Sequence, residues 1–121
     1  MPIKTVLIID DSPTERHILT QLLQGGGYEV STANSGEEGI QQARQTRPDL
    51  ILMDVVMPGT NGFQATRTLS RDEATKNIPV ILCTTKNQET DKVWGMRQGA
   101  QAYITKPVDG PALLAMIAAF G

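Results

Sequence analysis

The stretch VLIIDDSPTE, residues 6–15, joins four aliphatic residues directly to two adjacent aspartates. A continuous apolar run of this length is typical of a strand that is buried on both faces, as in the centre of a parallel sheet. After the aspartates, Ser12-Pro13-Thr14-Glu15 combines a capping box with proline at the first helical position, which predicts the start of a helix. A buried strand, an acid pair and a helix therefore follow one another directly.

Further apolar runs repeat this pattern along the chain. Leu50–Met53 and Val80–Cys83 resemble the first run, whereas residues 28–33 and 102–105 are weaker strands that we expect near the edges of the sheet. Helical patterns follow each strand, and we expect them over residues 13–24, from 36 to just before Pro48, 62–70, 89–98 and after Asp109. Five strand–helix units predict a three-layer α/β sandwich with a five-stranded parallel sheet.

Size and composition limit the possible classes of protein. The 121 residues correspond to one domain, which we expect to be a monomer over residues 1–121 without an output domain. The net charge is −2, and the 11 basic residues form no stripe, so we expect no nucleic-acid partner. The chain shows no signal-peptide pattern and no apolar run of about 18 residues, which argues against membrane insertion. A single cysteine, Cys83, is typical of the reducing cytoplasm.

Several side chains have predicted surroundings. On the first helix, one apolar stripe should comprise Ile18, Leu19, Leu22 and Leu23. His17 lies opposite that stripe and should be exposed, and Cys83 should be buried within its strand. For Trp94, packing against the sheet is slightly favoured over exposure as an anchor for a partner.

Polar residues stand where the predicted strands end. They are Asp10-Asp11, Asp54, Thr84-Thr85 and Lys106-Pro107. Parallel sheets bind ligands outside the carboxyl ends of their strands, so three carboxylates, a hydroxyl and an ammonium should share one pocket. Carboxylates that are gathered in this way favour a hard divalent cation, and Mg²⁺ prefers oxygen ligands.

With these residues in this order, the sequence resembles the response-regulator receiver domains of the CheY-like fold over essentially its whole length. The matching residues are Asp10-Asp11, Asp54 followed by Met57-Pro58, Thr84, and Lys106-Pro107. The resemblance implies the flavodoxin-like strand order 2-1-3-4-5. Residues 53–67, MDVVMPGTNGFQATR, and residues 87–100, NQETDKVWGMRQGA, further resemble the PilH-type regulators of type IV pilus twitching motility.

The resemblance implies a phosphorylation site. Asp54 would accept a phosphoryl group from a phosphohistidine of a CheA-like kinase. Mg²⁺ would be bound by Asp11, Asp54 and the backbone carbonyl of Val56, with Asp10 supporting it mainly through water. Lys106 would pair with the phosphoryl oxygens.

The resemblance also implies a switch. Thr84 would hydrogen-bond the phosphoryl group and move toward it, assisted by the backbone N–H of Thr85. Tyr103 would then turn inward and alter the surface made by the fourth helix, fifth strand and fifth helix. That surface would regulate a pilus-motor component or another signalling protein.

Three alternatives stay open at this point. The protein could be a phosphate sink for a shared kinase, because a sink carries the same acceptor site. A second alternative is a phosphatase of similar topology. Such an enzyme normally has an acid two residues after its nucleophile, and this chain has Val56 there, which argues against it. A phosphorylation-independent scaffold would not need the full set of Asp10, Asp11, Asp54, Thr84 and Lys106.

Overall fold

The computed structural model describes residues 2–120 and contains one parallel sheet. Its strand order is β2-β1-β3-β4-β5, as the resemblance implied. The strands are β1 (Thr5–Ile9), β2 (Glu29–Ala33), β3 (Leu50–Met53), β4 (Val80–Thr84) and β5 (Ala102–Thr105). The two weaker predicted strands, β2 and β5, form the edges of the sheet, and the three apolar runs form its centre.

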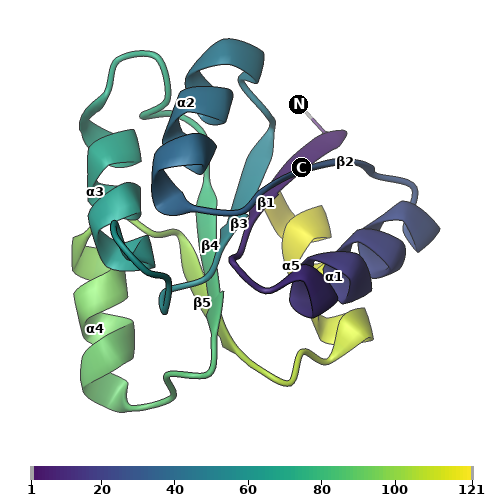
Figure 1. Ribbon diagram of the computed structural model, residues 1–121. Coiled ribbons are helices and arrows are strands. Elements are labelled where there is room, and N and C mark those ends of the chain that lie inside the picture. Colours follow the sequence, from purple (N-terminus) through teal and green to yellow (C-terminus); the bar gives the residue numbers. More distant parts are fainter. Residues whose placement is uncertain (1, 121) are drawn as a thin grey trace.

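Five helices cover both faces of the sheet and complete the predicted three-layer sandwich. They are α1 (Pro13–Gly25), α2 (Gly36–Thr46), α3 (Gly62–Arg71), α4 (Glu89–Arg97) and α5 (Gly110–Phe120). Helices α1 and α5 lie on one face, and α2, α3 and α4 lie on the other (Figure 1). In the described part of the chain, the helices fall short of the length and apolar character that a membrane span requires.

The central strands are apolar on both faces because each face is covered by helices. In β1, Leu7 and Ile9 belong to the core layer beneath α2 and α3, whereas Val6 and Ile8 belong to the layer beneath α1 and α5. All four side chains are fully buried. This two-sided burial explains why the strand has a continuous apolar run and no alternating pattern.

Helix boundaries follow the local signals. The Ser35 hydroxyl accepts a hydrogen bond from the Glu38 N–H (3.1 Å) at the start of α2. At the other end of this helix, Arg47 adopts a left-handed conformation with φ of 45°. The helix stops there because the residue before a proline, here Pro48, is disfavoured in the α conformation. The Asp109 carboxylate accepts a hydrogen bond from the Ala112 N–H (3.3 Å) at the start of α5.

Two predictions about apolar side chains are wrong. Ile18 is 52% exposed, because α1 turns Leu19 and Leu23 to the sheet and leaves Ile18 at the border of the stripe. Trp94 is 48% exposed. The neighbouring Gly95 faces the sheet, and each helical step rotates the side chain by about 100°, so Trp94 points away from it.

The predictions for His17 and Cys83 are confirmed. His17 is exposed on α1, and Cys83 is buried in β4. Burial raises the pKa of the Cys83 thiol to about 12. Because the thiolate is the reactive form, Cys83 is a structural side chain in the folded protein.

Gly39 provides a test of the packing between α2 and β1. A Cβ atom at this position would overlap the Ile9 side chain, so we expect Gly39→Ala to lower the free energy of unfolding by about 1–3 kcal/mol. Gly25→Ala is the matched control, because a Cβ atom there meets nothing within 4 Å. Urea denaturation of both variants measures the difference. An equal stability of the two variants would contradict the packing described here.

Candidate functional site

The carboxyl ends of the strands bring the predicted polar residues to one edge of the sheet. Ile9 of β1 is in register with Met53 of β3, so the residues that follow them, Asp10 and Asp54, leave neighbouring strands together. Thr84 of β4 is likewise in register with Thr105 of β5, which precedes Lys106. Residues that are far apart in sequence therefore meet because the strands are parallel.

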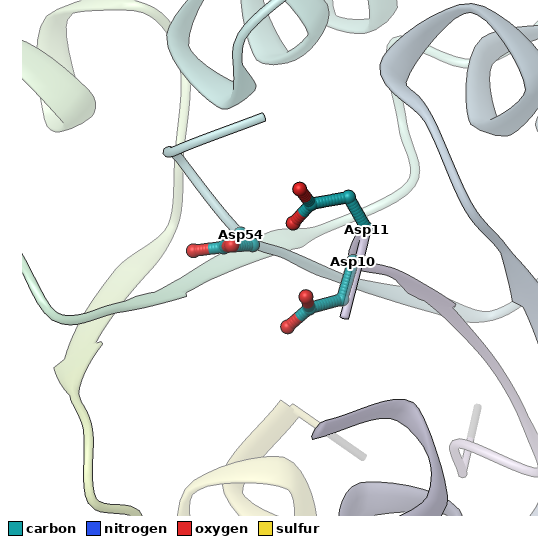
Figure 2. A group of neighbouring side chains, drawn as sticks. All are labelled: Asp10, Asp11 and Asp54. Carbon is teal, nitrogen blue, oxygen red and sulfur yellow. The ribbon is translucent and has the colours of Figure 1, made fainter. Parts of the chain in front are cut away.

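Three carboxylates form a compact cluster at this edge. One carboxylate oxygen each from Asp10, Asp11 and Asp54 lies within 4.8 Å of the others. The side chains of Asp10 and Asp11 point to the side on which Asp54 lies (Figure 2). Asp10 and Asp54 are buried, and Asp11 is exposed. Such a set of hard oxygen ligands, open to solvent on one side, fits a Mg²⁺ ion that keeps several waters.

A lysine with a largely covered side chain lies beside this cluster. The Nζ atom of Lys106 is 2.7 Å from Asp10 Oδ2 and 3.9 Å from Asp54 Oδ1. Burial by itself disfavours the charged ammonium, but the hydrogen bond to Asp10 and the charges of Asp54 and Asp10 outweigh it and raise the pKa of Lys106. Lys106 is therefore a fixed positive charge at the edge of the sheet.

Asp54 is placed differently from an ordinary surface carboxylate. Burial raises the pKa of Asp54, the Lys106 ammonium opposes this shift, and the Asp10 charge adds to it. The Val55 N–H donates a hydrogen bond to Asp54 Oδ1 (2.8 Å), which holds the carboxylate against the start of its own loop. A neighbouring cation would favour the ionised form that a nucleophile requires.

The loop between β1 and α1 is held by Asp10. The Ser12 N–H donates to Asp10 Oδ1 (2.9 Å), and Arg16 Nη1 donates to the Asp10 carbonyl (2.7 Å). Only half of the predicted capping box is therefore present: the Ser12 hydroxyl accepts from the Glu15 N–H (3.3 Å), but the Ser12 N–H is used by Asp10.

Glu15 is a site residue that the sequence reasoning missed. Its carboxylate lies 3.8 Å from the Nζ atom of Lys106 instead of returning to the helix start. The available signal was its position in the first turn of a helix that begins just after the acid pair. That turn necessarily lies at the same edge of the sheet.

The loop between β3 and α3 approaches the site closely. The Gly62 N–H donates to the Val55 carbonyl (2.9 Å), and a Cβ atom at Gly62 would overlap the backbone of Asp54 and Val55. Val56, whose carbonyl is the predicted third metal ligand, lies on this loop with an exposed side chain. Val56 and Lys86 border a shallow groove beside Asp54, together with Val55, Met57, Asn61 and Phe63.

Thr84 and Tyr103 are both bonded to the backbone of Lys86. The Thr84 hydroxyl accepts from the Lys86 N–H (3.3 Å), and the Tyr103 hydroxyl donates to the Lys86 carbonyl (2.7 Å). Burial raises the pKa of Tyr103 to about 12, so the phenol keeps its proton and can donate. Thr85, which lies between Thr84 and Lys86, has an exposed side chain. The Lys106-Pro107 peptide bond that follows β5 is cis.

The chain belongs to the response regulator receiver domains, whose family profile matches residues 6–118. Among curated proteins, the chain is 59% identical to Protein PilH of Pseudomonas aeruginosa, over 93% of this chain and 93% of that protein. It is also 40% identical to the phosphate regulon transcriptional regulatory protein PhoB of Pseudomonas aeruginosa, over 96% of this chain but only 51% of PhoB.

Solved structures show the same fold. The chemotaxis protein CheY4 of Vibrio cholerae superposes with a TM-score of 0.91 at 32% identity, covering 98% of this chain and 99% of that one. A CheY-like receiver domain protein from Methanospirillum hungatei gives a TM-score of 0.87 at 29% identity, covering 95% and 90% of the two chains. The fold and family expected from the sequence are thereby confirmed.

The acid cluster predicts a stabilising effect of magnesium. At a concentration 100 times its Kd, Mg²⁺ should raise the free energy of unfolding of the unaltered protein by about 2.7 kcal/mol. Asp11→Asn should lose most of this gain, because it removes one of the three clustered carboxylates, while its exposed position leaves the metal-free fold intact. Thermal denaturation with MgCl₂ or EDTA measures both quantities.

Glu29→Gln is the control for that experiment, because Glu29 is an exposed acid at the start of β2, whereas the acid cluster lies at the edge where the strands end. It should keep the full effect of Mg²⁺. An equal stabilisation of Asp11→Asn and Glu29→Gln would show that the ion acts elsewhere.

Proposed function

We propose that this chain is a response regulator that accepts a phosphoryl group on Asp54 from a phosphohistidine of a CheA-like histidine kinase. The observation that carries the proposal is the position of Asp54, which is buried directly after β3, beside an acid pair and 3.9 Å from the Lys106 ammonium. Membership of the receiver family supports it. We propose that the protein acts as a cytoplasmic monomer.

The reaction needs positioning and charge neutralisation more than covalent assistance. A carboxylate oxygen of Asp54 forms a bond to phosphorus as the bond from phosphorus to the histidine nitrogen breaks, and that nitrogen keeps the electron pair. Lys106 pairs with the phosphoryl oxygens, which bring about two negative charges into an acidic site. Its position 3.9 Å from Asp54 supports this role.

Magnesium would be held by Asp11, Asp54 and the Val56 carbonyl, with Asp10 supporting it mainly through water. When bound, it supplies positive charge that offsets the repulsion between the acid pair and the incoming phosphoryl group. Asp10 already shares a hydrogen bond with Lys106. Asp10 is therefore suited to orienting Lys106 and the water molecules around the metal, and not to binding the metal directly.

The output would be a change of the α4–β5–α5 surface. Phosphorylation favours the active member of two exchanging conformations, in which Thr84, assisted by the Thr85 N–H, bonds the phosphoryl group and Tyr103 occupies its inward position. The bonds that Thr84 and Tyr103 both make to Lys86 support such coupling. The exposed side chains of Val93, Trp94 and Met96 on α4 would form part of the altered surface.

The 59% identity to PilH favours regulation of type IV pilus twitching motility through a motor component. The second candidate is a phosphate sink for a shared kinase, which would use the same acceptor chemistry without a downstream target. The exposed apolar surface of α4 could serve either candidate, because a sink also has to dock on its kinase.

Phosphorylation by acetyl phosphate tests the acceptor directly. With Mg²⁺, we expect the intact mass to increase by one phosphoryl group, and we expect no increase in Asp54→Ala or in the presence of EDTA. If the unaltered protein gains nothing, transfer from a phosphorylated CheA-like kinase is measured next. Failure in both assays would refute the proposed acceptor role and would favour the phosphorylation-independent scaffold.

The switch is tested with beryllofluoride, which imitates the phosphoryl group, and with NMR of the Tyr103 ring. We expect the ring signals to shift in the unaltered protein and to shift much less in Thr84→Ala, which removes the hydroxyl that bonds Lys86. Thr85→Ala is the matched control, because its side chain is exposed. A full shift in Thr84→Ala would argue against the coupling.

A further inference from the structure

Glu37, in the first turn of α2, is bonded to the loop between β3 and α3. Its Oε1 atom accepts a hydrogen bond from the Thr60 N–H (2.8 Å). Hydrogen bonds from the Thr60 hydroxyl and the Thr60 N–H lower the pKa of Glu37 to about 2, although the residue is exposed. The carboxylate is therefore ionised at any pH at which the protein works.

Two glycines allow this contact. A Cβ atom on Gly36 would lie 2.6 Å from the Thr60 carbonyl oxygen, so a larger residue would push the loop away from α2. Gly59 has a φ of +75°, and a Cβ atom there would lie 3.0 Å from Glu37 Oε1. The close approach of loop and helix thus depends on glycine at both positions.

The other side of the loop is anchored to α3. The Asn61 side chain accepts from the Gln64 N–H (2.9 Å), and the Gln64 side chain accepts from the Asn61 N–H (3.0 Å), which makes a complete capping box. The segment 56–60 therefore begins shortly after Asp54. Its other end is held by two neighbouring contacts, that of Asn61 with Gln64 on α3 and that of Thr60 with Glu37 on α2. Within it Val56, Pro58 and Gly59 are exposed, whereas the Met57 side chain is buried in the core layer beneath α2 and α3.

We propose that Glu37 is a positioning residue for the metal site, because it holds the segment 56–60 in the conformation that presents the Val56 carbonyl to the acid cluster. This inference rests on the proposed function, in which that carbonyl is a metal ligand. A loop that is ordered before the metal arrives loses less conformational entropy on binding, so the metal binds more tightly. Contacts outside the ligand shell commonly act in this way.

Isothermal titration calorimetry with MgCl₂ on three variants tests the proposal. We expect Glu37→Ala to weaken Mg²⁺ binding by about tenfold. This is the lower end of the loss in affinity that is usual when a residue that supports a metal ligand is removed. Glu37→Gln should restore nearly all of the affinity, because its amide oxygen can still accept the Thr60 N–H. Glu38→Ala, which removes the same charge from the same exposed helical turn, should bind Mg²⁺ like the unaltered protein.

Amide hydrogen exchange in the metal-free proteins supplies a second readout that does not depend on the ion. Exchange at Thr60 should be faster in Glu37→Ala than in Glu37→Gln or Glu38→Ala, while β3 and α2 stay equally protected in all three. These results together would support the positioning role.

Three results would overturn it. One is equal Mg²⁺ affinity of Glu37→Ala and Glu38→Ala. Another is an affinity of Glu37→Gln as low as that of Glu37→Ala, which would assign the effect to charge instead of to the hydrogen bond. The third is unchanged Thr60 exchange in Glu37→Ala. Absence of Mg²⁺ binding by the unaltered protein would instead refute the metal site itself, and the positioning role with it, so the two failures are distinguishable.

Discussion

One ammonium group, that of Lys106, balances the charges at the edge of the sheet where the acids meet. Three carboxylates within 4.8 Å of one another repel, and two of them are buried, where an unpaired charge is costly. The Lys106 Nζ atom, 2.7 Å from Asp10, offsets part of that repulsion and links the end of β5 to the end of β1. The rest of the edge is organised around this pair: Ser12 and Arg16 fix Asp10, and Asp54 lies within reach of the same ammonium.

The sheet tolerates a cluster of charged residues at one edge because its interior is apolar. The three central strands bury their side chains against helices on both faces, so the polar site residues lie in the loops after the strands or, in the case of Thr84, at the last position of a strand. Burial raises the pKa of Asp54, so its ionised form is less stable here than in water. A bound cation would relieve the excess of negative charge, so cation binding at this edge and stability of the fold are physically connected.

Two loops connect this edge to more distant surfaces. The loop after β4 places Lys86 where its N–H donates to the Thr84 hydroxyl and its carbonyl accepts from the Tyr103 hydroxyl, so Thr84 is joined to the aromatic ring beside α4 through the backbone of one residue. The loop after β3 is bonded to α2 through Glu37 and Thr60. Residues 85–88 after β4 are exposed, whereas the loop after β3 buries Val55 and Met57, so the loop after β4 is the less supported of the two.

The strands, the helix starts, the acids and lysine at the strand ends, and the family could all be predicted from the sequence, because these depend on local apolar patterns and on residue order. Which residues meet could not be predicted in this way, because it depends on the folded structure. Lys106 and Asp10 are 96 positions apart, and Glu15 and Glu37 reach Lys106 and Thr60 instead of serving only their own helices. Likewise, Trp94 is exposed although it is apolar, because α4 turns the neighbouring Gly95 toward the sheet. Local patterns carry no information about such contacts, since these depend on how complete helices pack against the sheet.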